Sequence, residues 1–271
     1  MRWSAERGMI LNSIISMMGG GLAVGPYTSA FSAEVISRGG SLTANELTYL
    51  NTFEVSVGSD LAEFDRLWIH GLSNDVAART SFVNPTSTIV TAVNSPIFTA
   101  NEGYQGGAGM YLNSNFNPSI NGVKYQRNNA GMFVYSLTNL AFDSAEIGNQ
   151  IGANYSYILT RSALGSGVYA LNSTNDTAIA VADSLSLFQV LRTGSTPYSL
   201  YKRNVLLATV NQASAVLANQ SYFLLARNTN GSPGLQSYKK ISASGFSSSS
   251  INQSNFYSAL QALGTSIGWA V

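Results

Sequence analysis

The sequence predicts a mainly β fold: an antiparallel β-sandwich that follows an N-terminal arm and a small α-helical module and is closed by a C-terminal helix. Beyond Asn84-Pro85, short runs rich in β-branched and aromatic residues alternate with turns rich in Gly, Asn, Ser and Pro. The runs recur at close to the roughly 8 to 12 residues that separate the strands of a sandwich. We therefore divide the chain into an attachment arm (1–26), a helical module (27–80) and a sandwich with its closing helix (81–271).

The arm contains an apolar stretch, Met9 to Met18, which the glycines from Gly19 to Gly21 and the pair Gly25-Pro26 separate from the helical module. Its ten residues fall short of the roughly 20 that are needed to span a bilayer, so we expect no membrane insertion. An apolar arm usually needs a neighbouring molecule to hold it in place. We therefore expect the arm to attach the protein to an assembly.

Three helical segments are predicted in the module. Ser29 to Arg38 forms the first, which ends at Gly39-Gly40. Thr43 opens the second as its N-cap, because Glu46 follows three residues later at the spacing of a capping box. The inward face of the second helix is predicted to consist of Leu47, Leu50, Phe53 and Glu54. A third helix is predicted after Gly58, with an inward face of Leu61, Phe64, Leu67 and Trp68.

Strands are predicted where β-branched and aromatic residues concentrate between turn signals. The pair Arg203-Asn204 should form a tight hairpin turn, since both flanks are β-rich and Asn tolerates a positive φ. The closing helix is predicted from Ser254 to Gly268, because Phe256, Leu260, Leu263 and Ile267 recur at helical spacing. The predicted strands are Met132 to Tyr135, Tyr155 to Leu159, Gly167 to Leu171, Leu185 to Leu191, Leu200 to Lys202, Val205 to Val210 and Tyr222 to Ala226.

The composition excludes several classes of protein. Charged residues make up only 10% of the chain and the net charge is +1, so the protein lacks the long-range field that captures nucleic acid. Residues 1–103 hold five basic and nine acidic side chains, so their net charge is 5 − 9 = −4. The remaining residues hold nine basic and four acidic side chains, so their net charge is 9 − 4 = +5. This difference indicates two segments of different character. Because there is no cysteine, disulfides, thiolate metal sites and a cysteine nucleophile are excluded.

Four stretches taken together resemble a known group of proteins: Asn94 to Ser119, Leu200 to Thr209, Tyr222 to Gly234 and Ser244 to Trp269. The lead-in from Glu34 to Trp68 is similar as well. In their order and spacing, these stretches resemble virion proteins of tailed phages and prophages. The chains of those proteins end in a concanavalin A-like or laminin-G-like sandwich, of the jelly-roll kind, with a terminal helix.

This resemblance implies a structural protein of the virion surface, such as a capsid decoration, a head fibre or a tail fibre. Residues 1–80 would then contact capsid or tail proteins, and the sandwich would face outward. A homo-oligomer, for example a trimer, is also implied. The alternative is an adhesin whose sandwich recognises a carbohydrate on the host surface, and a glycan-degrading enzyme is a third and weaker option.

No catalytic residue is assigned. His70 is the only histidine and no nucleophile elbow accompanies it, so we expect a structural or exposed side chain and no catalytic triad. A glycosidase needs two carboxylates that flank the bond to be cleaved, and the sandwich offers only Asp143, Glu146, Asp176 and Asp183. We expect Asp143 to act as a local cap in a turn and Glu146 to open a strand. The chain is therefore predicted not to be an enzyme.

Cofactors and metals are not predicted either. The loop from Asn172 to Asp176 offers several oxygens but one carboxylate, which is a poor set for calcium, so we interpret it as a polar hairpin turn. The segment from Gly103 to Gly109 lacks the Lys-Ser/Thr pair of a phosphate-binding loop. We expect it to form flexible turns that bring Tyr104 and Met110-Tyr111 into the sandwich.

Aromatic side chains are the natural candidates for glycan contacts, because their rings combine an apolar face with, in Tyr and Trp, a polar group. The chain has 14 Tyr and 3 Trp, and at least half of them are expected to serve the core. No ligand-binding residue is therefore named. Those near predicted loops or ends are Tyr104, Tyr125, Tyr155, Tyr198 and Trp269.

Overall fold

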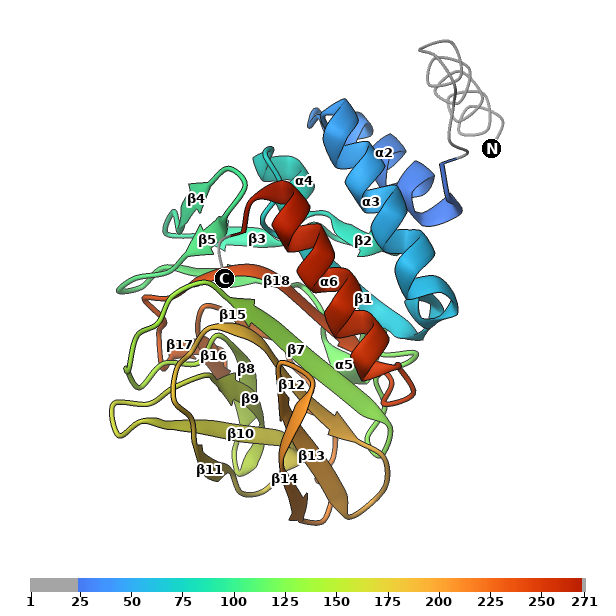
Figure 1. Cartoon of the computed structure of the whole chain (residues 1–271). Helices are drawn as coiled ribbons and strands as arrows, with labels where there is room; N and C mark the ends of the chain where they lie inside the picture. Colours follow the sequence, from blue (N-terminus) through green and yellow to red (C-terminus); the bar gives the residue numbers. More distant parts are fainter. Residues whose placement is uncertain (1–23, 270–271) are drawn as a thin grey trace.

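The computed structural model describes residues 24–269, so nearly all of the predicted arm (1–26), including Met9 to Met18, lies outside the described residues. Two antiparallel sheets face each other, and the helices α2 (Pro26–Ser37), α3 (Ala44–Val57) and α6 (Gln253–Ile267) lie on one side of the pair. Figure 1 shows the resulting layers, with α6 in front of the first sheet and β14 at the far end from the helices. The predicted antiparallel β-sandwich is confirmed.

The first sheet joins segments from both ends of the chain. All of its strand pairs are antiparallel. In spatial order it consists of β14 (Val205–Asn211), β13 (Pro197–Lys202), β12 (Ser186–Arg192), β7 (Ala130–Ser136), β18 (Lys240–Ser247), β1 (Phe64–Ile69) and β2 (Ser81–Val83), with β5 (Gly103–Gln105) on β18 and β4 (Ile97–Thr99) on β5.

The second sheet comes mostly from the middle of the chain. One of its pairs, between β16 and β8, is parallel. In spatial order it consists of β11 (Thr177–Ala180), β10 (Ser166–Ser173), β9 (Asn154–Leu159), β8 (Ile147–Ile151), β15 (Phe223–Leu224), β6 (Tyr111–Asn113) and β3 (Thr91–Val93), with β16 (Arg227–Thr229) on β8 and β17 (Ser232–Gly234) on β16.

The space between the two sheets is filled largely by aromatic side chains. Phe246 of β18 lies at the centre, with ring centroids 4.4 Å from Tyr222 and 4.7 Å from Phe116. Tyr125 meets the same ring edge-on at 5.8 Å, and Trp68 does so at 6.0 Å. Aromatic contacts of this kind add to the stabilisation from burial, so this cluster holds the two sheets together.

The outer face of the first sheet is covered by the helices. Phe256 of α6 packs 5.0 Å from Phe133 of β7 and 5.1 Å from Phe64 of β1, and it also meets Phe53 of α3 at 6.4 Å. Every residue of β7 and β12 is buried. The first sheet is therefore an inner layer, with the second sheet on one face and the helices on the other.

The helix predictions agree with the structure at both ends of the chain. The first helix begins slightly earlier than expected, at Pro26, and α6 spans the predicted closing helix. Thr43 is the N-cap of α3, and the expected capping box with Glu46 is present. The carboxylate of Glu54 accepts hydrogen bonds from the backbone N–H groups of Tyr27 and Thr28, which fixes the start of α2 against α3.

The third predicted helix, over Leu61 to Trp68, is wrong. A short 3-10 helix (Gly58–Glu63) leads instead into strand β1, which pairs with β18 and β2. Leu67 faces the helical layer and Trp68 faces the space between the sheets. A strand with two buried faces has a continuous apolar pattern that periodicity cannot distinguish from a buried helix, which explains the error.

The predicted hairpin is confirmed, because Arg203 and Asn204 adopt φ angles of 51° and 61° between the paired strands β13 and β14. The other predicted strands correspond to β7, β9, β10, β12 and β15, although β15 covers only Phe223–Leu224 of the predicted run. The short helices α4 (Asp75–Arg79) and α5 (Pro118–Asn121) and the short strands from β2 to β6 were not predicted. No helix within residues 24–269 is long and apolar enough to cross a membrane.

Replacing Phe256 with Ala should destabilise the whole fold, because its ring contacts the first sheet and α3 at once. We expect a loss of about 3–5 kcal/mol in the free energy of unfolding, the usual cost of removing a buried Phe. Urea unfolding measures it. Ser258→Ala on the exposed side of the same helix is the matched control and should change stability by less than about 0.5 kcal/mol. Equal effects of the two changes would show that the helices do not stabilise the sandwich.

Candidate functional site

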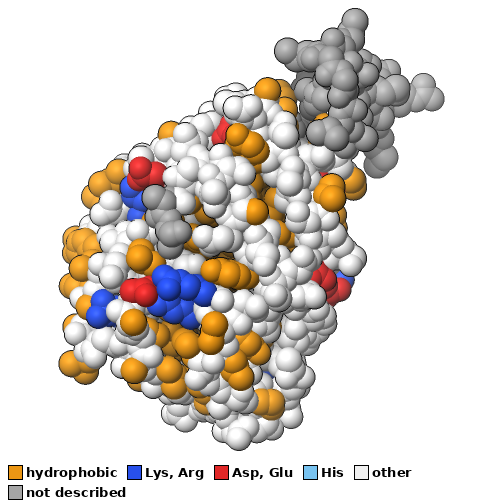
Figure 2. Space-filling view, in the orientation of Figure 1, with side chains coloured by type: hydrophobic (Ala, Val, Ile, Leu, Met, Phe, Trp, Pro, Cys, Tyr) orange, Lys and Arg blue, Asp and Glu red, His pale blue; other side chains and the backbone are white. Residues whose placement is uncertain are grey.

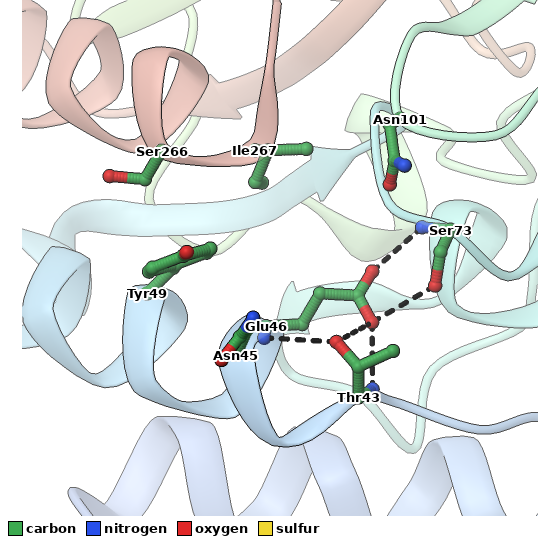
Figure 3. Close-up of a pocket in the computed structure, with 8 residues that line it drawn as sticks. All are labelled: Thr43, Asn45, Glu46, Tyr49, Ser73, Asn101, Ser266 and Ile267. Carbon is green, nitrogen blue, oxygen red and sulfur yellow. Dashed lines mark hydrogen bonds between the residues drawn. The ribbon is translucent and has the colours of Figure 1, made fainter.

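A polar pocket of about 210 Å³ lies at one end of the helical layer. It is bounded by the first turns of α3, the last turn of α6, the loop after β1 and the turn between β4 and β5. Figure 3 shows Tyr49 and Asn101 on opposite sides of this pocket. Its lining residues are Thr43, Asn45, Glu46, Tyr49, Ser73, Asn101, Ser266 and Ile267.

Glu46 fixes one wall of the pocket. Its carboxylate accepts hydrogen bonds from the Thr43 N–H (2.8 Å) and hydroxyl (2.9 Å), and from the Ser73 N–H (2.7 Å) and hydroxyl (3.0 Å). The N–H of Glu46 in turn donates to the Thr43 hydroxyl. The carboxylate is buried and has four donors, so it is occupied in holding α3 to the loop after β1.

Four other lining residues have side chains without such contacts. Asn101 sits in the turn between β4 and β5 with a φ of 62°, and its N–H donates to the carbonyl of Leu72. Within residues 24–269 the side chains of Asn45, Tyr49, Asn101 and Ser266 make no hydrogen bond to another residue. Two amides, a phenol and a hydroxyl therefore line the pocket without a hydrogen bond to another described residue.

The pocket continues into a shallow groove between α3 and α6. Tyr49 and Ser266 line both spaces, and the groove is otherwise lined by small or apolar side chains, Thr52, Phe53, Ser56, Ala259, Ala262 and Leu263. A separate, larger pocket of about 400 Å³ lies near Gly268. Its charged groups, Lys240 and Glu102, form an ion pair with each other. The polar side chains around Tyr49 have no such partner in the described part of the chain.

The lining of the Tyr49 pocket carries no Lys, Arg or His. Its one carboxylate, on Glu46, is already occupied by protein donors. No cluster of three or more His, Cys, Asp or Glu side chains occurs among residues 24–269. The pocket is therefore suited to hydrogen bonding with an uncharged polar ligand beside an aromatic ring, and it lacks the groups of a metal or acid–base site.

His70 is a structural side chain, as expected. It is fully buried, with Nδ1 2.8 Å from the carbonyl of Ala78 and Nε2 2.8 Å from the hydroxyl of Ser244. A carbonyl can only accept, so Nδ1 carries the proton and Nε2 accepts from Ser244. Burial lowers the pKa of His70 to about 4, because the charged form would lose its hydration.

Glu146 and Asp143, two of the four carboxylates of the sandwich, are engaged with other groups of the protein. Glu146 directly precedes β8, as predicted, but it is fully buried and lies 3.1 Å from the equally buried Nζ of Lys239. It also accepts from the Ser237 hydroxyl and the Thr160 N–H. Asp143 is not the local cap that the sequence suggested, since it accepts from the N–H of Ala163 in a distant loop. Both groups serve the structure.

The side chains of the loop from Asn172 to Asp176, which was considered as a calcium site, form hydrogen bonds with other residues of the chain. Asn172 is buried, and its side-chain oxygen accepts from the hydroxyls of Tyr125 and Ser156 while its amide donates to the carbonyl of Arg127. The carboxylate of Asp176 accepts from the Tyr157 hydroxyl. The loop therefore resembles the polar turn that was predicted, and its oxygens are used within the chain.

The aromatic residues singled out in the sequence are mostly core residues. Tyr104, Tyr125, Tyr198 and Trp269 are buried, and the indole N–H of Trp269 donates to the carbonyl of Gly71. Tyr155 is half-buried beside Arg227 on the outside of the second sheet. Tyr104, which was predicted to enter the sandwich from the segment that begins at Gly103, lies in the core.

Tyr111, however, does not enter the core. It stacks on Phe223 with 4.3 Å between the ring centroids, and the neighbouring Leu112 points into the core instead. The residues that line the pocket were missed, because Tyr49 and Asn45 look like an ordinary polar face of α3. Only tertiary folding brings Asn101 and Ser266 next to them.

Comparison with known proteins gives a likeness of fold. No family model and no curated protein matches the chain. The CBM40 domain of a Ruminococcus gnavus IT-sialidase has 13% identity and a TM-score of 0.43, over 62% of this chain and 96% of that one. The binding domain of botulinum neurotoxin serotype D has 14% identity and a TM-score of 0.46, over 78% and 53%. The leech intramolecular trans-sialidase has 11% identity and a TM-score of 0.42, over 63% and 27%. At these values the likeness concerns the fold alone.

The buried His70 should make stability depend on pH. Its pKa is near 6.5 in the unfolded chain and about 4 in the folded one, so the unfolded state binds the proton first as the pH falls. The contribution of the neutral side chain is complete above about pH 6.5 and is lost between there and about pH 4.

The measurement compares wild type with His70→Gln by urea unfolding at pH 7 and pH 5. The difference in unfolding free energy between the two proteins should fall by about 2 kcal/mol at the lower pH. The comparison cancels the titration of the carboxylates, which both proteins share. A difference that stays constant would contradict a neutral, buried His70.

Proposed function

We propose that the chain is a non-catalytic sugar-binding module, and that the Tyr49 pocket holds an uncharged sugar unit of a glycan. The observation that supports this function is the presence in one pocket of Asn45, Tyr49, Asn101 and Ser266, whose side chains make no hydrogen bond within the described part of the chain. Binding sites usually combine a hollow with a few placed polar groups. A polyhydroxylated ring matches such a set, because each hydroxyl both donates and accepts.

The arrangement of the pocket suits one face of a sugar. Tyr49 offers a ring for the apolar C–H groups and a hydroxyl for hydrogen bonding. The amide of Asn101 stands opposite in Figure 3, so that a ring between the two side chains would meet both kinds of contact. Because Glu46 holds Thr43 and Ser73 in place, this wall is ordered before a ligand arrives, which lowers the entropy cost of binding.

The absence of a cation in the lining favours an uncharged sugar over an acidic one. Recognition of a carboxylate normally uses Arg or Lys, often in a bidentate pair, and the lining has neither. The carboxylate of Glu46 also gives the wall a negative charge. Figure 2 shows that this face of the molecule has few charged side chains in general, in keeping with a surface that binds through neutral groups.

The non-catalytic part of the proposal is supported by the way the buried carboxylates are used. Glu46, Glu54, Asp65 and Glu146 all accept hydrogen bonds from backbone N–H groups. Asp65 holds the loop of Val123, Lys124 and Tyr125 in this way. Carboxylates fixed as structural acceptors are poorly placed to act as the acid and the nucleophile or base of a glycosidase.

The virion-surface role stays a prediction that rests on the sequence resemblance. It is compatible with sugar binding, since a particle protein with an exposed pocket would attach the particle to a glycan on its host. Thr43, Asn45, Glu46, Tyr49 and Ser73 belong to residues 1–80, so a virion protein that binds sugar here would have to contact the particle through other parts of that region and leave the pocket uncovered.

Replacing Tyr49 with Ala should weaken glycan binding about two- to tenfold, because loss of one aromatic contact costs about 0.5–1.5 kcal/mol. A glycan array first identifies the uncharged glycan bound by the full chain, and titration calorimetry then gives the affinities. Asn101→Ala should weaken binding to a similar degree through lost hydrogen bonds.

Val55→Ala is the matched control, because Val55 lies on the same helix with 72% of its side chain exposed and outside the pocket. It should leave the affinity unchanged. The proposal fails if no glycan binds saturably, or if Tyr49→Ala and Val55→Ala bind equally well.

A further inference from the structure

Strand β14 forms an edge of the first sheet that no other strand of the described residues covers. In Figure 1 it lies at the end of the sandwich away from the helices α2, α3 and α6. Its sequence, VLLATVN, contains no charged residue and no proline. Charges and prolines are the usual means by which proteins keep an exposed strand edge from pairing, so this edge is open to another strand.

The hydrogen bonding to β13 shows which backbone groups face outward. The Gln212 N–H donates to the carbonyl of Thr196. In an antiparallel pair, hydrogen-bonded and non-hydrogen-bonded positions alternate, so the pairs of β13 with Val210 and Ala208 are of the hydrogen-bonded kind. Thr209 and Asn211 therefore direct their N–H and C=O groups away from β13, toward solvent.

One irregularity limits how much of the edge can be used. The register with β13 shifts between Leu206 and Ala208, which leaves Leu207 as a bulged residue. A bulge disturbs the edge locally. The regular part begins at Ala208 and continues through Asn211.

We propose that β14 pairs antiparallel with β14 of a second copy of this chain, about a two-fold axis through Val210. Thr209 then lies opposite Asn211 of the partner subunit, and the two Val210 side chains meet across the axis. This register uses the regular part of the edge and avoids the bulge. The outward groups of Thr209 and Asn211 supply both donors and acceptors, so the edge is complementary to itself.

Charge favours this orientation and this partner. Arg203 lies at the hairpin tip next to β14. A parallel pair would place two Arg203 side chains side by side, whereas the antiparallel pair moves them to opposite ends. Near the tip, Val205 and Leu206 are 61% and 52% exposed, and they lie beyond the bulge, outside the paired segment. A charged peptide would gain nothing from this neutral edge.

The short pairing predicts a weak, concentration-dependent dimer, since stable interfaces bury about 1,200 Å² or more. Sedimentation velocity on the full chain should show the mass rising from 28.7 kDa toward twice that value as concentration increases. A monomer at all concentrations, or a trimer, would overturn the proposal.

Paired charge variants test the register. Thr209→Lys with Asn211→Lys places like charges opposite each other across the axis and should abolish the dimer. Thr209→Lys with Asn211→Glu places opposite charges there and should restore it. Both side chains are exposed, so the fold should tolerate either variant, which far-ultraviolet circular dichroism checks. Equal dimerisation of the two variants would contradict the pairing.

Cross-linking gives an independent test, because the chain has no cysteine of its own. Opposed residues of a non-hydrogen-bonded pair lie about 4.5 Å apart at Cα, within the range of a disulfide. Val210→Cys should therefore form a disulfide-linked dimer on mild oxidation. Ser258→Cys on the exposed side of α6, away from any strand edge, is the control for random collision, and equally fast cross-linking of the two variants would reject the proposal.

Discussion

The central strands of the first sheet, β7 and β12, are buried on both faces, and this double burial ties the helices to the sandwich. On one face of the sheet Phe246 packs against the aromatic rings of the inner core, and on the other face Phe256 of α6 packs against β1 and β7. The sheet cannot keep its helical side in water without exposing Phe133 and Phe64. The helices therefore form a third layer of the same fold.

This layering also creates the candidate site. Once α3 and α6 lie on the first sheet, their ends meet the loop after β1 and the turn between β4 and β5. Glu46 then bonds to Ser73, and Asn101 comes to face Tyr49. Similar carboxylate contacts, from Glu54 to the start of α2 and from Asp65 to the loop at Tyr125, fix other joints of the structure. The few acidic groups thus act mainly as acceptors for backbone N–H groups.

Local patterns sufficed for the elements that depend on neighbours in the sequence. The capping box at Thr43, the turn at Arg203 and the closing helix could all be predicted. Features set by contacts between distant segments could not be. Strand β1 is defined by its pairing with β18, and Glu146 is neutralised by Lys239, 93 residues away. The pocket also depends on contacts between distant segments, because no sequence pattern connects the segments that supply its polar groups.

Binding of an uncharged sugar at the end of the helical layer is the property on which the proposed function depends. Backbone amide chemical shifts of the isotopically labelled full chain, followed during titration with the glycan that it binds, test this most directly. We expect the shifted signals to cluster at Asn45, Tyr49, Ser73, Asn101 and Ser266. Shifts centred instead on the outer face of the second sheet, around Tyr155 and Arg227, would contradict sugar binding at the Tyr49 pocket.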